Sequence, residues 1–199
     1  MKLLVTRAVL VLCLAAAAAP ALAQSPQQPS TRARAWELGG KLSLAAVGLA
    51  SNALPSTVQK VFDSARELGK GLGVDVPLLP ERELDRTQTQ ALVMKYLLAD
   101  AGAPIAGHLG ATYGGDHSAL FEVSVKSTLL LLFYTPGGQE GAEVATVIRK
   151  RAVDARLPEG LWQPLVAKIE ARASFDEVKV GITDLQNGVR RHLAEEALP

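Results

Sequence analysis

Residues 117–134 read HSALFEVSVKSTLLLLFY, and this stretch decides the fold. On a helical wheel of about 100° per residue, polar side chains fall on two roughly opposite sides. His117, Ser124 and Thr128 form one side, and Ser118, Glu122 and Lys126 form the other. Apolar residues fill the rest, whereas a surface helix has one apolar and one polar stripe. We therefore predict an all-α, single-domain bundle of six or seven helices around a central apolar helix at about residues 116–134.

Helical spacing recurs on both sides of this stretch. It is clearest at residues 56–72, where apolar side chains return every three or four residues between Pro55 and Gly73. A capping box of Ser174 and Glu177 marks the start of the last helix. The predicted helices comprise residues 34–53, 56–72, 86–101, the central one, 140–157, one that follows Pro158, and 175–197. Pro104 could open a short helix through Tyr113, but its glycines make that segment loose or tightly packed.

Three local signals qualify this pattern. Asp116 stands directly before the central helix, where an N-cap residue belongs. Pro164 is expected to delay the start of the helix that follows Pro158. Residues 178–182 (VKVGI) alternate briefly and are the main place where a strand could replace a helix.

The first 23 residues have the parts of a secretory signal peptide. Lys2 and Arg7 form the positive region, residues 8–19 the apolar region, and residues 21–23 (ALA) the cleavage site. Residues 24–33 read as a disordered leader and residues 34–199 as the helical domain. We expect a periplasmic or secreted protein, and the composition suggests a bacterial source. An uncleaved leader that acts as an anchor is the alternative, and no later stretch reads as a membrane span.

Charge and cysteine content exclude several classes of function. The chain has 21 basic and 20 acidic residues, so removal of Lys2 and Arg7 leaves 19 basic residues and a formal charge of −1. Nucleic-acid binders usually carry a basic excess, so a nucleic-acid partner is not expected. Cys13 is the single cysteine and lies in the predicted signal peptide. The exported part therefore has no disulfide, zinc-thiolate site or cysteine nucleophile.

The charged residues of the central helix are the first candidates for a functional centre. Glu122 and Lys126 are four residues apart in the favoured acid-before-base order. Lys95 stands in another stretch that is apolar on nearly every side (ALVMKYLL, residues 91–98). The hypothesis is a buried polar network of Glu122, Lys126 and Lys95. The alternative is that the long side chains reach the rim of the bundle and keep their charges in water, or form a purely structural ion pair.

His108 and His117 are the second candidates. They flank a glycine-rich segment, with Tyr113 and Asp116 nearby. Two histidines and a carboxylate could bind a metal or serve acid–base chemistry. Their spacing matches no zinc-binding helix motif, and an ordinary histidine at a helix start is the more common case. No catalytic, cofactor or metal motif is recognised elsewhere, so we predict no cofactor and favour a protein that is not an enzyme.

Three functions remain open from the sequence. The preferred one is an exported noncatalytic helical module that binds a partner protein or an apolar small molecule in a groove between helices. The second is an enzyme or metal-binding protein that uses the candidate residues His108, His117, Glu122 and Lys126 near the glycine-rich turn. The third is an envelope-associated structural scaffold held by its leader.

Overall fold

The computed structural model describes residues 29–52, 63, 66–67, 69–77, 92 and 95–198. The described helices are α2 (Thr31–Asn52), the π-helix η1 (Tyr96–Ala101), α5 (Gly102–Tyr113), α6 (Gly115–Phe133), α7 (Gln139–Asp154), α8 (Glu159–Glu170) and α9 (Phe175–Glu196). These described residues contain no strand, and residues 178–182 lie within α9. The all-α bundle is thereby confirmed. The predicted signal peptide and most of the predicted helix at 56–72 lie outside the described residues.

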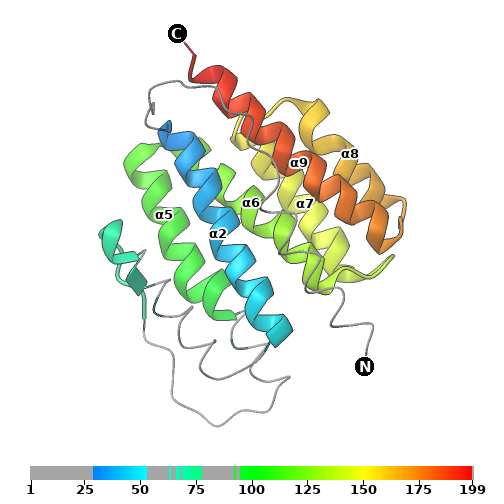
Figure 1. Ribbon diagram of the computed structural model, residues 1–199, viewed down its shortest axis with the longest axis horizontal. Helices are drawn as coiled ribbons and strands as arrows, with labels where there is room; N and C mark the ends of the chain where they lie inside the picture. The colour runs from blue at the N-terminus through cyan, green and yellow to red at the C-terminus, as the bar shows by residue number, and fades with distance from the viewer. Residues whose placement is uncertain are drawn as a thin grey trace.

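The central position of α6 explains why its sequence is apolar in nearly every direction. In Figure 1 it lies between α2 and α5 on one side and α7 and α9 on the other. One apolar cluster joins Leu120, Val123 and Leu130 of α6 to α7, α8 and α9. A second joins Phe121, Val125 and Leu129 of α6 to α2, η1 and α5. The helix is therefore shared by two cores, and each core requires an apolar face.

Small residues let α2 approach α6 closely. A Cβ atom placed on Gly39 would lie 2.6 Å from the Phe121 carbonyl oxygen and 2.9 Å from the Ser124 Cβ. Gly40 faces the Ser124 hydroxyl at 3.5 Å by the same measure. The buried Ser43 hydroxyl is satisfied within α2, because it donates to the carbonyl oxygens of Gly39 and Gly40 at 2.8 and 3.0 Å. The glycines that weaken helix propensity here are required by the crossing.

The buried hydroxyls of α6 are satisfied mostly by its own backbone and by α9. Ser127 and Thr128 both donate to the Ser124 carbonyl oxygen, at 3.1 and 2.9 Å. The Gln186 side-chain amide of α9 donates to both hydroxyls, at 3.1 and 3.3 Å. The Ser124 hydroxyl is fully buried and has no hydrogen-bond partner among the described residues. A buried hydroxyl without a hydrogen-bond partner lowers the folding stability by about 1–3 kcal/mol, so Ser124 is destabilising at this position beside Gly40.

One predicted helix end is present as expected, and two others differ from the predictions. Ser174 and Glu177 form the predicted capping box, and hydrogen bonds from the Ser174 side chain and backbone lower the pKa of Glu177. Helix α2 begins at Thr31, inside the predicted leader, with the Ser30 hydroxyl accepting from the Ala33 amide at 3.2 Å. The prediction for Pro164 is wrong, because α8 begins at Glu159 and contains this proline.

Two buried tyrosines connect distant parts of the bundle. The Tyr134 hydroxyl, after the end of α6, donates to the Ala173 carbonyl oxygen at 2.7 Å. Burial raises the pKa of Tyr134, and the charge of Glu177 adds to the effect. Tyr96 of η1 donates to the Pro77 carbonyl oxygen at 2.9 Å, and burial raises its pKa also. Ionisation of either phenol would break a hydrogen bond inside the protein, so both stay neutral at physiological pH.

Candidate functional site

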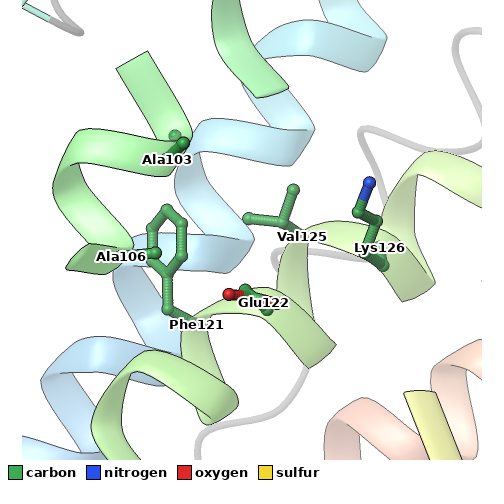
Figure 2. A pocket seen from close by; sticks show the side chains of 7 residues that line it. Ala103, Ala106, Phe121, Glu122, Val125 and Lys126 are labelled. Carbon is green, nitrogen blue, oxygen red and sulfur yellow. The ribbon is translucent and has the colours of Figure 1, made fainter. Parts of the chain in front are cut away.

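A hollow opens between α5 and α6, on the side of α6 that carries Glu122 and Lys126. Its volume is about 200 Å³. The α5 side is built from the small residues Gly102, Ala103 and Ala106, and the α6 side from Phe121, Glu122, Val125 and Lys126. Figure 2 shows the Phe121 ring directed toward Ala106, with the two charged residues along α6 beside it. The space exists because glycine and alanine on α5 have no large side chain to fill it, and Phe121 and Val125 below it are themselves buried.

Glu122 is held by an arginine of the neighbouring helix α7. Arg151 donates through Nε to one carboxylate oxygen at 2.7 Å and through a terminal nitrogen to the other at 3.1 Å. A further nitrogen of the same guanidinium donates to Asp154 at 3.2 Å. Desolvation alone would lower the pKa of Arg151, but the charge and hydrogen bonds of Glu122 and Asp154 outweigh it and raise that pKa. This two-point geometry is the strong form of a carboxylate–arginine pair.

The three charges of the first hypothesis are thus not joined in one network. Lys126 has no hydrogen bond or ion pair with the described residues and is partly buried at the edge of the hollow. Lys95 is exposed, so it does not contribute a buried charge. Glu122 and Lys126 do share one face of α6 and one hollow, as the spacing predicts. The ion pair between them does not form, because Arg151 occupies the carboxylate.

His108 and His117 both lie next to the Tyr113 ring. The centroid of this ring is 6.5 Å from that of His108 and 5.9 Å from that of His117. His117 Nδ1 is 2.8 Å from an oxygen of Asp116. The prediction that Asp116 is the N-cap of α6 is wrong, because Gly114 occupies that position with φ +103°. The carboxylate lies in the first helical turn instead, where the positive end of the helix dipole favours it.

Within the described part of the chain, no three histidine, cysteine, aspartate or glutamate side chains come close enough to hold a metal ion. The geometry at this end of α5 and α6 is an edge-on contact of the Tyr113 ring with His108 and a tilted contact with His117. It gives no support to the metal or catalytic alternative.

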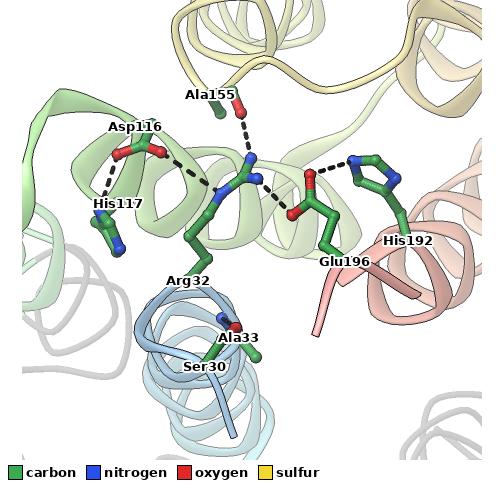
Figure 3. A network of polar contacts seen from close by, with 8 residues as sticks. All are labelled: Ser30, Arg32, Ala33, Asp116, His117, Ala155, His192 and Glu196. Carbon is green, nitrogen blue, oxygen red and sulfur yellow. Dashed lines mark hydrogen bonds and ion pairs between the residues drawn. The ribbon is translucent and has the colours of Figure 1, made fainter. Parts of the chain in front are cut away.

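An arginine outside all sequence predictions joins the ends of four helices. Arg32, in the first turn of α2, lies 3.5 Å from Asp116 of α6 and 2.5 Å from Glu196 of α9. Its remaining nitrogen donates to the Ala155 carbonyl oxygen, at the end of α7, at 2.5 Å. Glu196 also contacts His192 Nε2 at 3.2 Å. Figure 3 shows the guanidinium at the centre of these contacts, with a histidine beside each carboxylate.

Sequence reasoning missed Arg32, Arg151 and Glu196 because their partners are distant in the chain. Arg32 and Glu196 are 164 positions apart, and Arg151 and Glu122 are 29 apart. Local spacing identifies pairs within one helix, three or four residues apart, and carries no information on such contacts. The one available signal was Ser30, a good N-cap residue that places Arg32 in the first turn of a helix.

A second hollow, of about 320 Å³, lies between the start of α8 and the end of α9. It is lined by Pro158, Gly160, Leu161, Gly188, Arg191, His192 and Glu195. Leu161 is its one large apolar side chain, and a Cβ on Gly188 would lie 2.9 Å from it. This hollow is lined by three titratable side chains, Arg191, His192 and Glu195, whereas the hollow over Phe121 and Val125 has two, so we take the latter as the candidate functional site.

Comparison with known proteins adds no relative: no family model, no curated protein and no solved structure matches this chain. Among the described helices, none combines the length and the apolar character that crossing a membrane requires. Any functional assignment therefore depends on the hollow itself.

Proposed function

We propose that this chain is an exported, noncatalytic helical module that binds a small apolar or amphiphilic molecule in the hollow between α5 and α6. The single observation that carries the proposal is the lining of that hollow. Phe121 and Val125, which are both buried, form an apolar floor beside the small side chains of α5. Ligand sites are typically concave and mostly apolar, with few polar groups, and they occur between the helices of bundles.

The size of the hollow limits the class of ligand. Pockets for drug-sized molecules hold about 300–1,000 Å³. At about 200 Å³, this hollow fits a molecule of only a few carbon atoms, or one end of a longer molecule. A small molecule is favoured over a partner protein because the apolar area is recessed and small, whereas a stable protein interface covers roughly 800 Å² on each partner.

The charges around the hollow support binding without catalysis. A general base or nucleophile must be free to react, and the Glu122 carboxylate is held at two points by Arg151. The lining contains no histidine, serine or tyrosine. His108 and His117 do not belong to it. The exported location and the absence of a nucleic-acid partner remain part of the proposal, since they depend on the sequence of residues 1–23 and on net charge.

Filling the hollow tests the proposal. We expect 1-hexanol to shift the amide NMR signals of Phe121 and Val125 and to leave those of Leu161 and Gly188, in the second hollow, unchanged. The Ala103→Leu variant replaces a methyl with an isobutyl group at an exposed lining position and should weaken binding at least fivefold. Ala111→Leu is the matched control, because Ala111 is an exposed residue of α5 outside the lining. Shifts confined to other surfaces, or equal binding by both variants, would overturn the proposal.

A further inference from the structure

We infer that the ligand of this hollow is a short-chain monocarboxylate, with its alkyl chain over Phe121 and Val125 and its carboxylate at the Lys126 ammonium. This inference rests on the proposed function and specifies the substrate class of the same site. It follows from the unequal way in which the two charges of the hollow are used. Glu122 is fully engaged by Arg151, whereas Lys126 has no partner among the described residues.

The engagement of Glu122 disfavours a cationic ligand. An amine at this carboxylate would have to displace two charge-assisted hydrogen bonds, of 2.7 and 3.1 Å. Arg151 in turn is balanced by both Glu122 and Asp154. These three groups are paired with one another, so the ammonium of Lys126 is the charge left for a ligand.

The position of Lys126 determines the polarity of the ligand. Lys126 follows Val125 on α6 and lies one turn beyond Glu122, at the edge of an apolar floor. Figure 2 shows its amino group beside Val125, while the Phe121 ring lies farther along the hollow toward α5. A ligand that uses both features must be charged at one end and apolar at the other. A single ammonium is a compact point charge and matches a monoanion without a second basic group.

The length of the alkyl chain is set by the enclosed volume. Each methylene group that enters the hollow should tighten binding by roughly fourfold, in proportion to the apolar area removed from water. The gain should stop once the hollow of about 200 Å³ is full, and further methylenes then extend into solvent. A plateau in the chain-length series is therefore a specific consequence of this site, which adsorption to an open surface would not show.

The experiment is a titration of the full chain with butanoate, hexanoate and octanoate, beside 1-hexanol, hexylamine and hexyl phosphate, followed by amide NMR shifts of Phe121 and Val125. We expect hexanoate to bind about fivefold more tightly than 1-hexanol, the upper range for a solvent-accessible ion pair. Lys126→Met should abolish that preference, so that the variant binds hexanoate no more tightly than 1-hexanol. Raising the salt concentration to about 1 M should also reduce the preference of the wild-type protein for hexanoate. Lys150→Met, at an exposed position of α7, is the control and should change neither Kd.

The outcomes separate this inference from the proposed function. Equal Kd values for 1-hexanol and hexanoate in the wild-type protein would overturn the carboxylate and leave the binding module in place. Tighter binding of hexylamine or hexyl phosphate than of hexanoate would also overturn the carboxylate, because the site would then prefer another head group. If no probe shifts the signals of the hollow, the proposed function fails together with the inference.

Discussion

At the scale of single residues, the Glu122 carboxylate depends on Arg151 for its hydrogen bonds. Replacing Arg151 with Met would leave a partly buried carboxylate without its two donors. We expect the free energy of unfolding to fall by about 1–2 kcal/mol. Hydrogen bonds to charged groups contribute roughly 1.5–3 kcal/mol, and partial exposure of both side chains to water reduces that figure. Urea denaturation at pH 7 measures the change.

The same experiment has an internal control. Asp154 contacts Arg151 from an exposed position, so Asp154→Asn should change the stability by less than about 0.5 kcal/mol. The Glu122→Gln and Arg151→Met changes should be strongly non-additive when combined, since the double variant no longer strands a charge. Additive losses would show that the two side chains do not act as a pair.

The sequence predicted the charged residues of α6 correctly as neighbours, but not their partners. Glu122 and Lys126 share a face because residues four apart always do in a helix. Whether they bind one another depends on what α7 brings to that face, and Arg151 belongs to a basic run that reads as surface. Lys95 was expected to be buried because its neighbours in sequence are apolar, yet its side chain is exposed. Burial of a single long side chain is thus not determined by the hydropathy around it.

At the scale of elements, the approach of α2 to α6 depends on Gly39. We expect Gly39→Ala to destabilise the protein by about 1–3 kcal/mol, because the new methyl group would overlap the Phe121 carbonyl oxygen and force the helices apart. The intrinsic helix preference of alanine acts in the other direction by up to about 1 kcal/mol. The measured sign therefore reports which effect is larger, and thermal unfolding followed by circular dichroism measures it.

Gly107 in α5 is the matched control for this change. A Cβ at this exposed position meets no described atom within 4 Å, so Gly107→Ala should be neutral or stabilising. If both alanine variants were equally stable, the close approach of α2 and α6 would not be a constraint on the sequence. This crossing was only partly predictable: the glycines in residues 34–53 indicate a close contact, but they do not identify Ser124 as the residue opposite.

Most helices were predictable because each has a local cause. The central helix follows from its apolar residues in all directions, and α9 follows from its capping box. Gly114 and Asp116 illustrate the limit of such local signals. Both are suited to a helix start; Gly114 takes the N-cap position, and the Asp116 carboxylate contacts Arg32 and His117 instead. A cap cannot be assigned from sequence where long-range partners compete for the capping side chain.

At the scale of the whole molecule, two apolar cores share α6, and charged contacts fasten the helix ends around them. Arg32 has the widest reach of these contacts, since it joins α2 to the ends of α6, α7 and α9. We expect Arg32→Ala to lower the free energy of unfolding by about 2 kcal/mol, because it removes three contacts to charged or carbonyl groups and leaves two carboxylates facing each other.

The control and the conservative variant define what Arg32 contributes. Arg34 is exposed on the same helix and has no ion pair with the described residues, so Arg34→Ala should change stability by less than about 0.5 kcal/mol. Arg32→Lys keeps the charge but not the planar fork, and it should recover only part of the loss. Hydrogen exchange of the α2 amides should quicken in Arg32→Ala before the amides of α7 and α8 respond, because Arg32 lies in the first turn of α2 and joins this end to α7 and α9. Uniform acceleration across all helices would instead mean that the bundle opens as one unit and that Arg32 stabilises it only globally.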